Sequence, residues 1–150
     1  IIKTLTHCRM YDDNTYLFQS KNPSRFLEFV VEFPEKVILG TTIESEFYYY
    51  ELTKAPTPLE RYHFMCKAQL KGFKKTVSIE PILDFGDTLI NWIKDINPEF
   101  VSIGADSKGH DLPEPNWDKV QELIKGLKKF TEVKVKANLE RSHNNKEKKN

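Results

Sequence analysis

Polar side chains follow five short apolar runs of this sequence, and their types suit the binding of a small molecule. They are hydroxyls, carboxylates, lysines, one amide and one glycine: Ser20, Lys21, Thr42, Glu44, Ser78, Glu80, Gly104, Asp106, Ser107, Lys136 and Asn138. In parallel α/β folds, ligands bind at the carboxyl ends of the strands, where the loops are free to vary. The polar ends of all five runs therefore predict a ligand site formed by this set.

A spacing of two residues within these groups sharpens the prediction. Side chains at i and i+2 lie on the same face of a strand. The resulting pairs are Thr42 with Glu44, Ser78 with Glu80, Gly104 with Asp106, and Lys136 with Asn138. Parallel strands are normally apolar on both faces, and carboxylates buried there need partners, which Lys21 and Lys136 can supply. The alternative interpretation is that these residues are ordinary loop caps and ion pairs over a packed barrel.

Other motifs in the sequence point to no specific chemistry. His7, His63, His110 and His143 have no metal-ligand spacing to one another or to a cysteine. The sequence has no glycine-rich nucleotide-binding motif and no serine in a nucleophile elbow. The aromatic run at 47–50 (FYYY) is either a stacking platform over the site or packing for a loop on the barrel rim.

The elements that must position the site are strands separated by helices. The apolar runs are rich in β-branched and aromatic residues, as strands are, and span Thr15–Ser20, Lys36–Ile43, Lys75–Ile79, Phe100–Ile103 and Glu132–Ala137. This alternation predicts an α/β fold with a parallel sheet. More specifically, we expect a parallel (β/α) partial barrel, a TIM-barrel-like half-barrel of about five strands with flanking helices.

Four helices are predicted between the strands. Asn22-Pro23 and the capping box Thr57-Pro58-Leu59-Glu60 open the first two, Gly72 closes the second, and Asn97-Pro98 ends the third. Each helix carries apolar residues at helical spacing. These stripes are Phe26, Phe29, Val30 and Phe33; Leu59, Tyr62, Cys66 and Leu70; Leu89, Ile90, Ile93 and Ile96; and Trp117, Val120, Leu123, Ile124, Leu127 and Phe130.

The 150 residues suit one domain, which we place at 1–143, followed by a disordered polar tail at 144–150 (NNKEKKN). The chain begins at Ile1, in what looks like mid-helix, so we expect a fragment or a trimmed product of a longer protein. Its first and last strands would leave open sheet edges. We expect either that missing strands cover the first edge or that the chain self-associates.

Composition excludes several classes of partner. The formal net charge is +1, which gives no electrostatic case for nucleic acid or an anionic membrane. No apolar run approaches the roughly 20 residues that span a bilayer, and we expect no signal peptide, since Ile1-Ile2-Lys3 lacks both an apolar core and a cleavage site. A single disulfide between Cys8 and Cys66 is one alternative. The balanced, disulfide-poor composition instead favours the cytoplasm, with both thiols packed in the core.

The strand ends carry a resemblance to a known group of proteins. The segments Y-L-F-Q-S-K-N-P from Tyr16, V-I-L-G-T-T-I-E-S from Val37, V-S-I-E-P from Val77, V-S-I-G-A-D-S-K-G from Val101 and V-K-V-K-A-N from Val133 follow one another in order. In this order and spacing the sequence resembles phage- and prophage-associated radical-SAM-like proteins of unknown function. Their usual series is T-K-R-P, G-V-S-V-E, S-x-E-P-L-L and G-G-E-S-G, followed by a strand with lysine.

The resemblance implies a partial barrel that binds S-adenosylmethionine against a four-iron, four-sulfur cluster. The hydroxyls and carboxylates of the set would contact the ribose and amino-acid parts of the cofactor, and Lys21 and Lys136 would meet its carboxylate or an anionic substrate. The sequence departs from the family because the cluster motif C-x-x-x-C-x-x-C is absent, and Asp106 replaces a glutamate. The isolated chain is therefore expected to be inactive in radical chemistry.

Three functional hypotheses follow. The first is the cofactor- and substrate-binding portion of a radical S-adenosylmethionine-type enzyme whose substrate is unknown. The second is a non-catalytic α/β module that binds a small anionic ligand or a protein partner. The third is a metal-independent hydrolase or lyase that uses Glu44 and Glu80 as an acid/base pair, which requires a raised pKa on one carboxyl.

Overall fold

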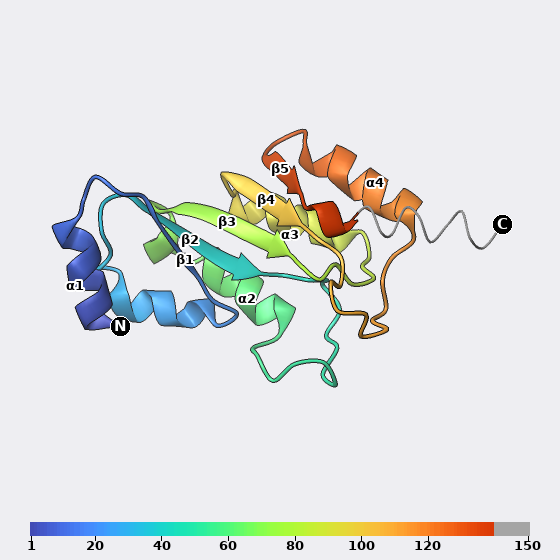
Figure 1. Ribbon diagram of the computed structural model, residues 1–150, viewed down its shortest axis with the longest axis horizontal. Coiled ribbons are helices and arrows are strands. Elements are labelled where there is room, and N and C mark those ends of the chain that lie inside the picture. Colours follow the sequence, from blue (N-terminus) through green and yellow to red (C-terminus); the bar gives the residue numbers. More distant parts are fainter. Residues whose placement is uncertain (140–150) are drawn as a thin grey trace.

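A computed structural model describes residues 1–139 of the chain (Figure 1). Five strands form one parallel sheet in the order β1-β2-β3-β4-β5. They are β1 (Tyr16–Gln19), β2 (Val37–Thr42), β3 (Lys74–Ile79), β4 (Phe100–Ile103) and β5 (Glu132–Val135). The predicted strands and the α/β parallel fold, consistent with a partial barrel, are confirmed. The predicted tail at 144–150 and His143 lie outside the described residues.

The strand order follows the chain order, so each crossover moves one position along the sheet. Crossovers between parallel strands are right-handed, which places the connecting segments of such a sheet on the same face. The arrowheads of β2, β3 and β4 point toward one end of the molecule, and the loops that follow β2 and β4 lie there (Figure 1). This end is the carboxyl edge at which the sequence predicts a site.

Four α-helices and three short 3₁₀ helices are described within residues 1–139. The α-helices are α1 (Ile2–Met10), α2 (Pro58–Met65), α3 (Thr88–Ile96) and α4 (Trp117–Leu127). The 3₁₀ helices are η1 (Pro23–Phe29), η2 (Ala68–Leu70) and η3 (Ala137–Leu139). The capping box at the start of α2 is present, because the Thr57 side chain accepts from the Glu60 backbone and the Glu60 carboxylate accepts from Thr57 N. Asn97 ends α3 in the left-handed conformation.

One face of the sheet is apolar and carries the core. Every second residue along each strand points to this face, and these side chains pack with buried side chains of α3 and α4. The buried members are Leu39, Ile43, Val77, Ile79, Val101, Ile103, Leu89, Ile93, Ile96, Val120, Leu123 and Leu127. Each fully buried aliphatic side chain contributes roughly 1.5–3 kcal/mol relative to exposure, so this layer holds the sheet and its helices together.

The other face of the sheet is polar. Thr42, Ser78, Ser102 and Lys134 are partners in register, so a row of hydroxyls crosses three strands and ends on a lysine. Parallel sheets are usually apolar on both faces. The polar face of this sheet is therefore consistent with the inner side of a partial barrel.

Two helix predictions were wrong in detail. The segment that begins at Pro23 is a 3₁₀ helix, and α2 ends at Met65 rather than at Gly72. The stripe predicted for this segment is confirmed in part: Tyr62, Cys66 and Leu70 pack in the core, whereas Leu59 is 46% exposed. Pro58, Arg61 and Met65 are also buried, and the prediction did not include them. Pro58, Arg61 and Met65 are spaced by three and four residues, so they lie on one side of the helix. A search for apolar residues missed this side because its central residue is an arginine.

The two cysteines are free thiols. Cys8 is buried on α1, and Cys66, which follows α2, is partly buried. Burial raises the pKa of the Cys66 thiol. The disulfide alternative is therefore not formed. Among the described residues, no helix is both long enough and apolar enough to cross a membrane.

The sheet edges give a prediction about self-association. Within residues 1–139, β1 and β5 each pair with one neighbour only, and Leu17 on β1 is 51% exposed. Open edges recruit further strands, and a lysine on an edge opposes this. We expect concentration-dependent association in sedimentation velocity, weakened by Leu17→Lys and unchanged by Val31→Lys, since Val31 is exposed but lies outside the sheet. A single monomeric species at high concentration would contradict the prediction.

Candidate functional site

A pocket of about 390 Å³ lies at the carboxyl edge of the sheet. It is formed by the ends of β1 and β2, the loop between β2 and α2, the start of α2, and the loops after β3 and β4. Its lining residues include charged, aromatic and aliphatic side chains, among them Lys21, Glu44, Phe47, Tyr48, Tyr49, Glu51, Arg61, Leu83 and His110. Of the site residues predicted from sequence, Lys21 and Glu44 line this pocket.

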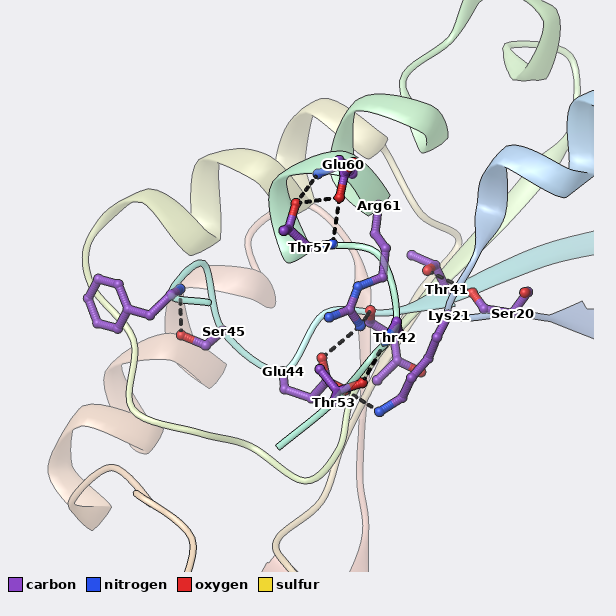
Figure 2. A network of polar contacts seen from close by, with 12 residues as sticks. Ser20, Lys21, Thr41, Thr42, Glu44, Ser45, Thr53, Thr57, Glu60 and Arg61 are labelled. Carbon is purple, nitrogen blue, oxygen red and sulfur yellow. Dashed lines mark hydrogen bonds and ion pairs between the residues drawn. The ribbon is translucent and has the colours of Figure 1, made fainter. Parts of the chain in front are cut away.

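Glu44 is the centre of the pocket's charged network (Figure 2). Arg61 Nη1 donates to Glu44 Oε2 at 2.8 Å and to the carbonyl oxygen of Thr42 at 2.6 Å. Lys21 Nζ donates to the other carboxylate oxygen, Oε1. The predicted partnership of Lys21 with a strand-end carboxylate is therefore present, and two cations flank one carboxylate.

Arg61 is the member of this network that sequence reasoning missed. Its side chain is 1% exposed, and it comes from the face of α2 that turns toward the end of β2. The capping box at Thr57 fixes where α2 begins, and so fixes which residue of its first turns meets Glu44. A buried guanidinium needs a paired anion, so an arginine on the inner face of a capped helix was the available signal.

The electrostatics of Glu44 bear on the acid/base hypothesis. Burial raises the pKa of its carboxyl, but the Arg61 guanidinium and the Lys21 ammonium together outweigh burial and hold the pKa below its usual range. Glu44 is therefore ionised at neutral pH and suited to binding rather than to proton donation. This direction does not support Glu44 as the acid of a Glu44–Glu80 pair.

The aromatic run after Glu44 forms a wall of the pocket. Phe47, Tyr48 and Tyr49 line it, and the base of their loop is anchored to the segment after β3. Ser45 Oγ and the Tyr49 hydroxyl both donate to the carbonyl oxygen of Asp84, at 2.6 and 3.1 Å. Phe47 and Tyr48 remain 46% and 47% exposed. Anchored, half-exposed rings beside a pocket can stack on a flat ligand.

A second polar cluster lies on the polar face, centred on Glu80. Lys136 Nζ donates to Glu80 Oε2, and Asn138 Nδ2 donates to Glu80 Oε1 at 3.3 Å and to the Ala105 carbonyl oxygen at 2.8 Å. Gly104 stands between them, on the intervening strand end. An added Cβ there would come within 2.6 Å of Glu80 Oε1 and 3.0 Å of Asn138 Oδ1. The missing side chain of Gly104 lets Glu80 reach across β4.

The remaining predicted residues have different surroundings. Asp106 is buried and accepts hydrogen bonds from its own loop, whereas Ser107 is exposed. Ser20 Oγ caps the backbone N–H of Asn22, as the loop-cap interpretation expects. Thr42 Oγ1 accepts from Gln19 Nε2 at 3.2 Å. Ser78 is buried in β3, within the hydroxyl row. The set therefore divides into the pocket, the Glu80 cluster, the Asp106 loop and local caps.

No family model, curated protein or solved structure matches this chain. The resemblance to the phage-associated family therefore stays a prediction, and so do its cofactors. Among residues 1–139, no group of three or more His, Cys, Asp or Glu side chains is placed to hold a metal ion. Cys8 lies on α1, whereas Cys66 follows α2. The two cysteines do not supply the three thiolates that the implied cluster motif requires.

Proposed function

We propose that this chain is the cofactor- and substrate-binding part of a radical S-adenosylmethionine-type enzyme, and that the pocket beside Glu44 binds S-adenosylmethionine. The proposal draws on the resemblance of the strand-end segments and on the chemistry of the pocket. The observation that carries it is that two cations, Lys21 and Arg61, line the same pocket as the aromatic rings, at the carboxyl edge of the parallel sheet. We call these two cations and Glu44 the floor of the pocket.

The cations of the pocket suit the carboxylate of an amino acid. Lys21 and Arg61 together balance the single charge of Glu44 and leave one positive charge at the floor. Arg61 lines the pocket, and its Nε is buried and has no hydrogen-bond partner among the described residues. We expect the remaining positive charge, carried by Lys21 and Arg61 together, to attract the carboxylate of a bound amino acid.

The rest of the pocket suits the other parts of the same cofactor. Glu51 lines the pocket and is exposed, so it places a negative charge where an ammonium or sulfonium group can lie. Phe47 and Tyr48 offer ring faces to an adenine, and stacking of a base on an aromatic side chain is worth about 1–3 kcal/mol. A molecule with charges of both signs and a flat ring fits these features better than a simple anion.

The second candidate is a non-catalytic module that binds a small anion. The Glu80 cluster favours it. Glu80, Lys136 and Asn138 were predicted to contact the cofactor, but they bond to one another instead, as a structural ion pair does. In that case Lys21 and Arg61 would bind phosphate or a simple carboxylate, and Glu51 would be unimportant. The two candidates thus predict different ligands for the same floor.

Titration calorimetry with S-adenosylmethionine, adenosine monophosphate and inorganic phosphate separates them. We expect one S-adenosylmethionine per chain, with binding weakened about tenfold or more by Lys21→Met, because a charged hydrogen bond contributes about 1.5–3 kcal/mol. Glu51→Gln should weaken the binding of S-adenosylmethionine and leave the binding of phosphate and adenosine monophosphate unchanged. Lys36→Met is the matched control, since Lys36 is exposed before β2 at the opposite edge.

Each alternative result has a definite meaning. Binding of phosphate or adenosine monophosphate without S-adenosylmethionine would favour the anion-binding module. No heat with any of the three would overturn the proposed function, as would equal losses in Lys21→Met and Lys36→Met.

A further inference from the structure

We infer that His110 is a proton-transfer residue for the molecule that occupies the pocket, and that Asp106 is the residue that positions its ring. His110 lines the pocket, on the loop after β4. Its Nδ1 lies 2.9 Å from Asp106 Oδ1, and the Asp106 residue is only 6% exposed. A buried carboxylate bound to one nitrogen of a partly exposed imidazole is the arrangement by which proteins orient a histidine base.

Asp106 is held firmly as an anion. Lys108 N donates to its Oδ1 at 3.0 Å, and His110 N donates to its Oδ2. These backbone donors, with the His110 ring, hold the pKa of the Asp106 carboxyl well below its usual range. Asp106 N itself donates to Glu114 Oε1 at 3.1 Å, which fixes the backbone at the start of the loop. The carboxylate is therefore both ionised and fixed in place.

The ionised carboxylate determines which ring nitrogen carries the proton. A carboxylate without a proton can only accept hydrogen bonds, so Nδ1 of neutral His110 must be the N–H. Nε2 is then the nitrogen with the free lone pair. Because the His110 side chain is 59% exposed and lines the pocket, that lone pair is accessible to a bound molecule.

A role limited to capping the loop leaves part of this arrangement unexplained. The backbone bonds from Lys108 and His110 already cap the loop through Asp106. The bond to the imidazole is additional, and it holds the ring of a pocket-lining residue against a buried anion. Structural ring contacts of the other described histidines are to tyrosines, as with His7 beside Tyr11 and His63 beside Tyr62.

The proton transfer that we assign to His110 is balanced as follows. The Nε2 lone pair takes a proton from an O–H or N–H group of the bound molecule, and the bonding electrons stay on that oxygen or nitrogen. The resulting imidazolium carries one positive charge, which the adjacent Asp106 carboxylate stabilises. The proton returns to the product or to water. Such general acid–base assistance typically contributes 10²–10⁴-fold to a rate.

This inference rests on the proposed function only in requiring that the pocket hold a small molecule. It requires neither a cluster nor radical chemistry. A test must therefore examine the ring of His110 by itself, and separately its response to a pocket ligand. His63, exposed on α2, serves as the internal control.

The experiment combines ring ¹⁵N NMR with carbethoxylation by diethyl pyrocarbonate, which acylates an unprotonated ring nitrogen. Spectra of the full chain, assigned with His110→Gln, should show His110 in the Nδ1–H form, unlike His63. In Asp106→Asn, which keeps a carbonyl oxygen for the loop, His110 should shift toward the tautomer ratio of His63. S-adenosylmethionine should slow carbethoxylation of His110 at least fivefold and leave that of His63 unchanged.

The outcomes separate the two claims. If calorimetry shows that S-adenosylmethionine binds but the carbethoxylation rate of His110 does not change, the inference is overturned and the proposed function survives. If S-adenosylmethionine does not bind, the proposed function fails, and the tautomer decides the inference. His110 in the Nε2–H form would then overturn it, and the Nδ1–H form, lost in Asp106→Asn, would support it.

Discussion

Replacing Arg61 with alanine is expected to lower the free energy of unfolding by about 3–5 kcal/mol, the range measured when one partner of a buried ion pair is removed. The guanidinium is 1% exposed and bonds both the Glu44 carboxylate and the Thr42 carbonyl oxygen. Its loss would leave a buried carboxylate with Lys21 alone and a carbonyl oxygen without this donor. The end of β2 and the floor of the pocket would lose their connection to α2.

Urea unfolding followed by tryptophan fluorescence measures this effect. The matched control is Arg25→Ala, because Arg25 is exposed and its ion pair with Glu28, at 3.7 Å, should contribute less than about 1 kcal/mol. The double variant Arg61→Met with Glu44→Gln should recover part of the loss, since it removes the charge that Arg61→Ala strands. A change below about 1 kcal/mol in Arg61→Ala would show that the network does not hold the pocket together.

Replacing Gly104 with alanine is the second effect that we expect, a loss of about 1 kcal/mol, because the new Cβ displaces the end of the flexible Glu80 side chain from its partly exposed ion pair. The new Cβ would lie 2.6 Å from Glu80 Oε1, and 2.8 Å from Glu80 Cδ. The Glu80 side chain would have to leave, and its bonds to Lys136 and Asn138 would break with it. The cost therefore includes part of the Glu80 cluster as well as the steric clash.

Gly72→Ala is the matched control for this substitution. An added Cβ at Gly72 meets no atom within 4 Å, and its backbone is outside the left-handed region. Reduced freedom of the unfolded chain should make Gly72→Ala neutral or stabilising by up to about 1 kcal/mol. In Gly104→Ala with Glu80→Ala, most of the steric loss should disappear. Equal stabilities of the two single glycine variants in urea would refute the close approach at Gly104.

The strands and their polar ends could be predicted from the sequence because both follow short-range rules. β-branched residues mark the strands, and period-two spacing placed Ser78 with Glu80 on one face. The register places Ser78 in the hydroxyl row of the polar face, and Glu80 follows directly after β3. The sequence also predicted that Lys21 and Lys136 would pair with strand-end carboxylates, as they do with Glu44 and Glu80.

The pairing that completes the pocket could not be predicted in the same way. Arg61 reaches Glu44 only because α2 packs with Pro58, Arg61 and Met65 inward, and that choice depends on tertiary packing rather than on the apolar pattern. His110 has no ligand spacing in sequence. It meets the pocket because a hydrogen-bonded loop folds back around Asp106.

The central claim, a ligand site at the carboxyl edge beside Glu44, is tested most directly by mapping amide chemical shifts while S-adenosylmethionine is added. We predict saturable shifts that gather at residues 44–53 and at Lys21, Arg61 and His110, which line the pocket from separate segments. The amide signals of residues at the amino edge of the sheet, near Lys36 and Lys74, should not shift. No saturable shift, or shifts confined to that opposite edge, would contradict the account.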